Sequence, residues 1–427
     1  MQRKRVVVTG YGAVSPFGFG AETLWSSLLA SKNGITKIPD LDLQGDIVQI
    51  AGCLPGFDDH LLKPTFYGKL PSRDSEKCFL AAVQEALEQS GLLNDGKTDR
   101  NRILLAIADR KPSLIHYLDR LAPFLKIACN SDNFDRKLYE LLEHTNFVPE
   151  DTDDESINHY VARAYQIAGP QLSIATACAS SNNAIGEAYL KIAQGIIETA
   201  IAGGAYNFDF NAMAGFSRLG ALTQNPDQDT ASRPFDQDRN GFVMGSGCGI
   251  LILEEYESAR NRGVNILAEI AGYASFNDAY RATDSDPSAE SAARAIKACL
   301  AQAGVSVYEV QYINAHGTST VMNDLMETRA IKKVFGEQAY NIPVSSTKSM
   351  IGHSIMAAAA IEAIVCIKSL QANMIHPTRN CCSTEPEMDL DYVRGKSREI
   401  ALRHVLSNSF GFGGQNTSVL FRRFDNK

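Results

Sequence analysis

The stretch Ser173-Ile-Ala-Thr-Ala-Cys178-Ala-Ser-Ser-Asn-Asn-Ala-Ile-Gly-Glu-Ala-Tyr189 reads as a buried strand, a tight turn and the start of a helix, with Cys178 at the junction. From about Ser180 onward, apolar residues recur with the period of roughly 3.6 that marks an amphipathic helix. The N–H groups and the dipole at the start of a helix favour an anion. We therefore expect a stabilised thiolate at Cys178, with small neighbours that leave room for a substrate.

Two histidines downstream lie in turns rich in glycine, serine and threonine. One turn reads Asn314-Ala-His316-Gly-Thr-Ser-Thr320, and the other reads Ser346-Thr-Lys348-Ser-Met-Ile-Gly-His353. Each follows an apolar run that resembles a strand. A single cysteine or histidine is most often structural. Three such elements in one chain instead indicate a reactive site.

Four motifs together resemble the β-ketoacyl-[acyl-carrier-protein] synthases, the condensing enzymes of fatty-acid and polyketide synthesis, and above all their synthase II type. They are Thr-Ala-Cys178, the two histidine turns, and Asn408-Ser-Phe-Gly-Phe412-Gly-Gly. The resemblance implies an α/β thiolase-like fold, with two duplicated halves in a five-layer αβαβα arrangement and the active site between them. The expected halves are 1–258, with the cysteine, and 259–427, with the histidines and a glycine-rich gate loop.

The resemblance also implies a role for each motif residue. Cys178 would take an acyl group from an acyl carrier protein, and the N–H groups of Cys178 and Phe412 would form the oxyanion hole. His316 and His353 would stabilise the enolate that a malonyl thioester leaves when it loses CO2, and Lys348 would order both rings. The other expected site residues are Phe410 at the gate with Phe412, Thr318, Thr320 and Phe216 at the substrate, and Asp324 and Glu327 in a supporting polar network.

Composition limits the possible partners and compartments. The 427 residues carry a net charge of −8, which argues against broad nucleic-acid affinity. Nine cysteines form no C-x-x-C pair, so we expect neither a metal nor a disulfide framework. We find no signal-peptide core and no apolar stretch of about 18 residues, and expect a soluble, cytoplasmic protein without a membrane segment.

The expected partners follow from the same resemblance. An acyl carrier protein is acidic, so its docking on an acidic enzyme needs a local basic patch. Candidates are Lys63, Lys69, Arg73, Lys77 and Arg218. The family usually forms homodimers, and a heterodimer with a related synthase remains open. No cofactor is expected.

Strand-like and helical patterns alternate along the chain. Buried strands are expected at 5–9, 102–108, 199–204, 248–254, 266–274 and 310–314, and helices at 21–31, 75–90, 290–303 and 355–372. This alternation predicts two mainly parallel sheets. The segment 10–18 contains part of a dinucleotide fingerprint, but Ser15 and Pro16 replace its third glycine and helix start. We interpret its glycines as turn residues.

Some features depart from the synthase II pattern. Residues 109–170 lack its glycine-rich turn, and Arg281 stands where the family often has histidine. Chain-length preference, the dimer partner and the choice between housekeeping and specialised pathways therefore stay open.

Three alternatives to a condensing enzyme are open, and particular residues argue against each. A non-catalytic chain-length-factor-like partner lacks the nucleophile, which is present here as Cys178. A degradative thiolase needs a second cysteine near the C-terminus in a Cys-x-Gly context, and a papain-like hydrolase needs a C-G-S-C-W motif. The chain has neither feature.

Overall fold

The computed structural model describes residues 3–39, 48–62, 71, 73–94, 96, 98–109, 133, 136–137, 140 and 156–425. Its largest element is a mixed sheet of ten strands. The N-terminal strands are, in spatial order, β5 (Ile103–Ala108), β6 (Thr199–Tyr206), β7 (Gly247–Glu255) and β1 (Val6–Ser15), with β2 (Gly18–Phe19) paired to β1. The C-terminal strands continue as β8 (Ala268–Asn277), β14 (Gln415–Arg422), β13 (His404–Gly411), β9 (Tyr312–Asn314) and β10 (Val344–Ser345).

The two sets of strands repeat one topology. In each set the first strand along the chain, β1 or β8, lies at the centre, and the last strand, β7 or β14, lies next to it. Then follow the penultimate strand, β6 or β13, and the earlier strand, β5 or β9, which is parallel to it. The sets meet where three residues of β1 pair with three of β8. The expected duplication is confirmed as a repeated topology.

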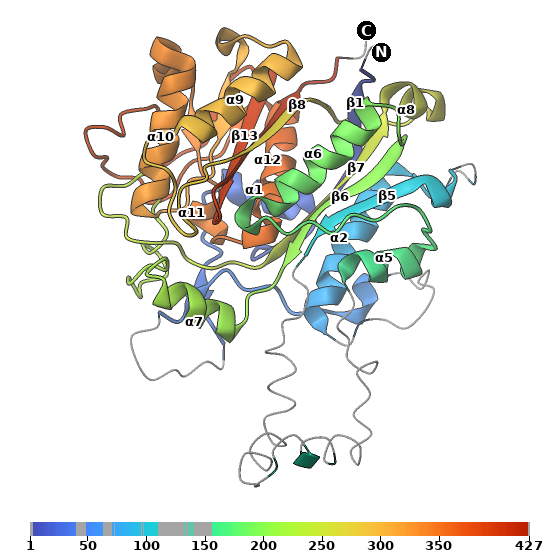
Figure 1. Ribbon diagram of the computed structural model, residues 1–427, viewed down its shortest axis with the longest axis horizontal. Coiled ribbons are helices and arrows are strands. Elements are labelled where there is room, and N and C mark those ends of the chain that lie inside the picture. Colours follow the sequence, from blue (N-terminus) through green and yellow to red (C-terminus); the bar gives the residue numbers. More distant parts are fainter. Residues whose placement is uncertain are drawn as a thin grey trace.

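Helices form three layers around these strands (Figure 1). The helices α6 (Ser180–Ala193) and α12 (Ala358–Ala372) contact strands of both sets and each other, which makes them the central layer. On the N-terminal strands lie α2 (Asp74–Ser90) and α5 (Ile157–Tyr165), and on the C-terminal strands lies α9 (Glu290–Ala303) with α10 (Val321–Phe335) beside it. The five-layer arrangement is thus present.

Short elements complete the described part of the chain. The helices are α1 (Ala21–Leu29), α7 (Phe210–Arg218), α8 (Tyr256–Arg262) and α11 (Lys348–Ile351). Two small two-stranded sheets pair β3 (Thr36–Lys37) with β4 (Ile50–Ala51), and β11 (Met374–Ile375) with β12 (Arg398–Glu399).

The expectation of mainly parallel sheets was wrong. Within the large sheet β5–β6, β9–β13 and β9–β10 are parallel, while the other pairs of neighbours are antiparallel. The strands β13 and β14, for example, form a hairpin closed by Gly413 and Gly414. A strand buried on both faces is apolar throughout, so its sequence pattern carries no sign of its direction. Direction depends on the connections instead.

The glycines at the start of the chain are strand residues and not turn residues. The strand β1 continues through Gly10 and Gly12 to Ser15. A Cβ at Gly10 would lie 2.3 Å from the carbonyl oxygen of Ala86, and one at Gly12 would lie 2.0 Å from that of Ala82. Glycine is needed here because the backbone of α2 packs directly on β1.

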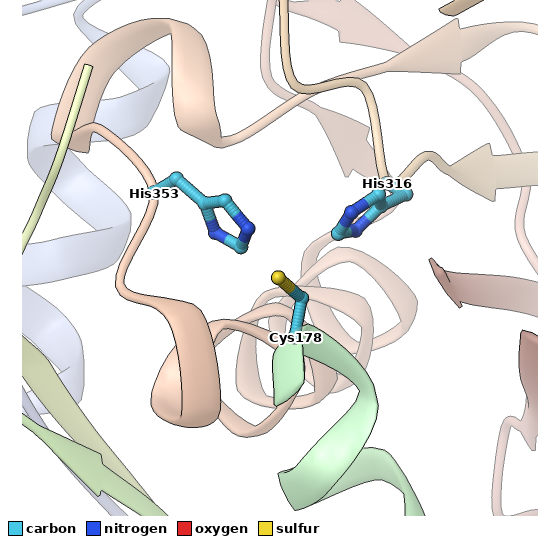
Figure 2. Close-up of side chains that lie close together, drawn as sticks. All are labelled: Cys178, His316 and His353. Atoms are coloured by element: carbon cyan, nitrogen blue, oxygen red, sulfur yellow. The ribbon is translucent and has the colours of Figure 1, made fainter. Parts of the chain in front are cut away.

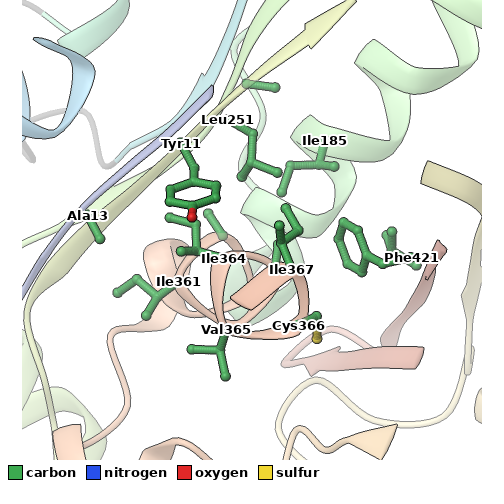
Figure 3. Packing of buried hydrophobic residues seen from close by; sticks show 14 of the residues in the cluster. Tyr11, Ala13, Ile185, Leu251, Ile361, Ile364, Val365, Cys366, Ile367 and Phe421 are labelled. Atoms are coloured by element: carbon green, nitrogen blue, oxygen red, sulfur yellow. The ribbon is translucent and has the colours of Figure 1, made fainter. Parts of the chain in front are cut away.

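The central helix α12 is apolar over most of its surface because strands and helices surround it. Figure 3 shows Ile361, Ile364 and Ile367 of α12 packed against Tyr11 of β1 and Phe421 of β14. The segment Ile355–Ala372 has the length and composition of a membrane span, which corrects the expectation that no such stretch exists, but 83% of it is buried inside the protein. It serves here as a core helix.

Candidate active site

Cys178 lies in a turn of 3-10 helix, Ala177–Ala179, directly before α6. Ala177 has a φ of 50°, a left-handed conformation that turns the chain sharply into the helix. Ser180 clamps this turn, because its Oγ accepts the N–H of Thr176 at 2.8 Å and donates to the carbonyl oxygen of Ala177 at 2.6 Å. The expected strand before the turn was wrong in part. Residues 171–175 are extended but alternate between exposed and half-buried, and only Gln171 forms a β-bridge, to Leu105 of β5.

The structure brings Cys178 together with both histidines (Figure 2). The potential ligand atoms of the three side chains all lie within 4.8 Å of one another. Cys178 is 7% exposed, His316 3% and His353 2%. His316 follows β9, and His353 follows α11, so three distant segments converge on one point. The imidazole rings stand nearly perpendicular, with centroids 5.3 Å apart.

The thiol of Cys178 is not the stabilised thiolate that its position before a helix suggested. Burial raises the pKa of Cys178 to about 11. The charge of Lys348 and the N–H groups of Phe412 and Cys178 act in the opposite direction but do not outweigh burial. The free protein therefore holds a protonated thiol near neutral pH.

The two histidines are neutral. Burial, followed by the nearby charge of Lys348, lowers the pKa of His316 and of His353 well below the usual value. In the described part of the chain, both ring nitrogens of His353 and Nδ1 of His316 are buried without a hydrogen-bond partner. Such rings present free polar atoms to a bound substrate.

Lys348 lies behind the rings and is 2% exposed. Its Nζ donates to the carbonyl oxygen of His316 at 2.6 Å and to Oε1 of Glu362 at 2.5 Å. Glu362 was missed in the sequence, although a signal existed: it is an acidic residue inside the apolar run 355–367. Burial raises the pKa of Glu362 to about 7, against the effect of Lys348. The buried pair ties α12 to the His316 turn.

Asp324 and Glu327 of α10 hold the His316 turn from the other side. The Glu327 carboxylate accepts the N–H groups of His316 at 2.9 Å and Gly317 at 2.8 Å. The Asp324 carboxylate accepts the N–H groups of Thr318 and Ser319. Both side chains are fully buried. They are placed to support the turn and not to contact a substrate.

The end of β13 lies against the cysteine turn. A Cβ at Gly411 would lie 2.9 Å from the carbonyl oxygen of Thr176 and 3.2 Å from the nitrogen of Cys178, so glycine permits this close approach. The next residue, Phe412, directs its N–H toward the sulfur of Cys178. The ring of Phe412 lies 5.9 Å from that of Phe216, between centroids.

A pocket of about 210 Å³ leads to the three reactive side chains. Among the expected residues, it is lined by Cys178, His316, His353, Thr318, Thr320, Phe216, Phe410 and Phe412. Lys348, Asp324 and Glu327 lie behind its wall. Its rim includes the exposed apolar residues Leu219, Val321 and Met322.

The candidate basic patch is only partly covered by the structure. Lys63 and Lys69 lie outside the described residues. Arg73 and Lys77 form ion pairs at the start of α2 with Glu76 and Asp74. Arg218 is exposed at the end of α7, and two of its neighbours, Phe216 and Leu219, line the pocket.

The departures from the synthase II pattern are also only partly visible. Arg281 forms an exposed ion pair with Asp284, which lines the pocket. Much of 109–170 lies outside the described residues. At its start, the Asp109 carboxylate accepts the N–H of Ile157 at 2.6 Å.

Comparison with known proteins identifies relatives along the whole chain. The family description "Beta-ketoacyl synthase, N-terminal domain" matches residues 3–259, and "Beta-ketoacyl synthase, C-terminal domain" matches residues 267–382. The chain is 37% identical over 443 residues to 3-oxoacyl-[acyl-carrier-protein] synthase 2 of Staphylococcus aureus strain N315, covering 99% of each protein. The enzyme of the same name from a Synechocystis strain is also 37% identical, over 441 residues and 99% of each protein.

Solved structures agree with this relationship. A β-ketoacyl synthase from Burkholderia phymatum has a TM-score of 0.86 and 32% identity, with 99% of this chain and 100% of that chain covered. A ketosynthase complex of a type II polyketide synthase with its acyl carrier protein gives the same TM-score, identity and coverage. These matches and the converging motif residues lead to one conclusion: this chain belongs to the β-ketoacyl synthase family.

Proposed function

We propose that this chain is a β-ketoacyl-[acyl-carrier-protein] synthase, which condenses an acyl thioester with malonyl-acyl carrier protein in fatty-acid or polyketide elongation. The observation that carries the proposal is the meeting of Cys178, His316 and His353 within 4.8 Å at the base of a pocket. A nucleophile and two neutral hydrogen-bonding rings are what such a reaction needs.

In the first half-reaction, Cys178 takes the acyl group. Its sulfur attacks the acyl thioester carbonyl, a new carbon–sulfur bond forms, and the carrier leaves as a thiol with the proton that Cys178 gave up. The N–H groups of Cys178 and Phe412 hold the oxyanion of the tetrahedral intermediate. Oxyanion stabilisation of this type contributes about 3 kcal/mol for each donor.

In the second half-reaction, malonyl thioester loses CO2. The electron pair of the broken carbon–carbon bond moves into an enolate, whose oxygen lies against His316 and His353. The enolate carbon attacks the acyl-Cys178 carbonyl, and the sulfur leaves to take up a proton again. The product is a β-ketoacyl thioester two carbons longer. Lys348, Asp324 and Glu327 hold the histidine turn in place and take no part in bond formation.

The pocket wall supports the remaining assignments. Thr318 and Thr320, whose hydroxyl groups lie 2.8 Å apart, line the route along which the carrier's arm would enter. Phe216, Phe410 and Phe412 surround the acyl chain, and Phe412, between Gly411 and Gly413, gates it. Arg218 and the apolar rim are the described surface nearest to a docked carrier.

We also propose how the enzyme is divided into halves, where it is located and how it assembles. The halves 1–258 and 259–427 each supply part of one site, although residue 258 falls inside α8. The enzyme works as a soluble, cytoplasmic homodimer, and a heterodimer is the second candidate because one related structure is a ketosynthase in complex with its chain length factor.

Intact-protein mass spectrometry tests the function. The chain, mixed with acyl-acyl carrier proteins, should gain one acyl group, and Cys178→Ala should gain none. The His353→Ala variant should be acylated but should not release the extended product after malonyl-acyl carrier protein is added. Cys382→Ala, which removes an exposed thiol, is the matched control and should behave as the wild type. The absence of acylation with every chain tested would overturn the proposal and favour a non-catalytic partner.

A further inference from the structure

The three side chains at the base of the pocket are those proposed for condensation, and together they can also act as metal ligands. A thiol and two imidazoles are ligands for Zn²⁺ and other soft or borderline metals, whereas Mg²⁺ and Ca²⁺ need oxygen ligands. The nearby carboxylates of Glu362 and Glu327 are turned away, toward Lys348 and the His316 turn. The set therefore offers one sulfur and two nitrogens.

The geometry is close to that of a metal site. The candidate ligand atoms of Cys178, His316 and His353 lie within 4.8 Å of one another. Tetrahedral zinc with ordinary bond lengths places sulfur and nitrogen ligands about 3.3 to 3.6 Å apart. Movements of the side-chain ligand atoms by about 1 Å would bring them to the separation found around zinc. The three side chains face a common centre in Figure 2.

Two further observations point to a ligand at this centre. Nδ1 of His316 and both ring nitrogens of His353 are buried without a hydrogen-bond partner among the described residues. Buried polar atoms are normally paired, so these rings are available to an incoming electrophile. The pocket of about 210 Å³ also reaches all three side chains, which provides an entry path and space for a fourth ligand.

Charge does not prevent binding. The charge of Lys348 opposes a bound cation, but its Nζ is paired with Oε1 of Glu362 at 2.5 Å, which offsets part of that charge. The thiolate that forms on metal binding supplies one negative charge to the ion. The imidazoles are already neutral and need not lose a proton.

We propose that Cys178, His316 and His353 form an inhibitory metal site, in which Zn²⁺ or a metal of similar ligand preference binds the free enzyme and blocks acylation. One metal–sulfur and two metal–nitrogen bonds form, the thiol proton passes to solvent, and no oxidation occurs. The acyl group and the metal compete for the same sulfur, so the acylated enzyme is protected. The metal site itself needs only the three side chains, whereas its inhibitory effect rests on the proposed function.

Cobalt(II) is the probe, because a cobalt–thiolate bond gives a charge-transfer absorption that does not depend on enzyme activity. The full-length, metal-free protein should show this absorption with an end point at one equivalent of Co²⁺. Cys178→Ser should abolish it, and His353→Asn should weaken cobalt binding by at least about tenfold. The Cys382→Ser control should leave the titration unchanged. Circular dichroism should show that each variant is folded.

A second measurement avoids mutation altogether. Wild-type protein whose Cys178 has been capped with iodoacetamide should lose the cobalt absorption. One equivalent of Zn²⁺ should prevent acylation of uncapped protein, and EDTA should restore it. An absorption that survives in Cys178→Ser, or that disappears in Cys382→Ser, would overturn the site. Cobalt binding without any condensation activity would instead overturn the proposed function and leave the metal site standing.

Discussion

The thiol of Cys178 is held in its protonated form by its own burial. With a raised pKa, the free thiol is a weak nucleophile near neutral pH. The two histidine rings have lowered pKa values, so an added proton on either ring is unfavourable near neutral pH. In the proposed mechanism, the proton of the thiol would therefore leave with the carrier as the acyl group arrives.

Alkylation of Cys178 should rise steeply with pH. The thiolate is the reactive form, and with a pKa of about 11 its fraction grows about tenfold for each pH unit between pH 7 and pH 10. The iodoacetamide reaction, followed by peptide mass spectrometry in the Cys382→Ser background, should show this slope. A rate that levels off near pH 7 would contradict the prediction and indicate a stabilised thiolate.

The buried pair of Lys348 and Glu362 should be costly to break. Lys348→Met leaves the Glu362 carboxylate without its cation in the core, which should lower the free energy of unfolding by about 3 to 5 kcal/mol. Chemical denaturation measures this change. The double variant Lys348→Met/Glu362→Leu should recover much of the loss.

A matched control lies on the surface. Lys333 forms an exposed ion pair with Glu290, so Lys333→Met should change the free energy of unfolding far less. Equal losses in the free energy of unfolding for Lys348→Met and Lys333→Met would show that burial does not increase the contribution of the Lys348–Glu362 pair to stability.

At the level of elements, the site depends on the contact between the end of β13 and the turn before α6. Gly411→Ala places a methyl group 2.9 Å from the carbonyl oxygen of Thr176 and should push the two elements apart. We expect a loss of about 1 to 3 kcal/mol in the free energy of unfolding and slower acylation of Cys178. Thermal unfolding and intact-protein mass spectrometry check the two effects.

Gly56→Ala is the control for this substitution. A Cβ at Gly56 meets nothing within 4 Å, so the variant should acylate at the wild-type rate. If Gly411→Ala also acylates normally, the cysteine turn does not need the close approach of β13.

At the level of the whole molecule, the described residues place no further full strand beyond β5 at that edge of the large sheet. Leu105 of β5 donates to Pro170 and accepts from Leu172, so the segment that follows is bonded to β5 around Gln171. Gln171, Ser173 and Ala175 are exposed. A strand edge with unpaired backbone groups pairs readily with another strand. The segment 171–175 presents such groups a few residues before Cys178.

We therefore expect the chain to form a dimer through this edge. Light scattering after size exclusion should give twice the mass of the chain. Ser173→Pro removes a backbone donor that faces away from β5 and should shift the mass toward the monomer. Ser173→Ala keeps the donor and should remain dimeric. A dimer that persists in Ser173→Pro would place the interface elsewhere.

Much of the helical structure could be predicted from the sequence because helices carry a local periodic signal. The expected helix 290–303 coincides with α9, and the expected helix from Ser180 coincides with α6. The directions of the strands could not be predicted. The strand β7, for example, is buried along its whole length, so its sequence does not indicate whether it runs parallel or antiparallel to its neighbours. The sequence also did not reveal that β1 continues through Gly10 and Gly12. Glycine is needed there because the backbone of α2 packs closely on β1, and this contact is not visible in the sequence.

The site shows the same contrast between features with a local sequence signal and features that depend on distant segments. The candidate residues could be found in the sequence: a cysteine before a helix, two histidines in glycine-rich turns and a glycine-rich loop are each recognisable because each motif is local. Their arrangement in space could be found only from the fold. It placed residues 178, 316 and 353 within 4.8 Å, buried the thiol so that its pKa rises, and paired Lys348 with Glu362. Distances and burial arise from packing between segments far apart in the chain, and no local pattern records them.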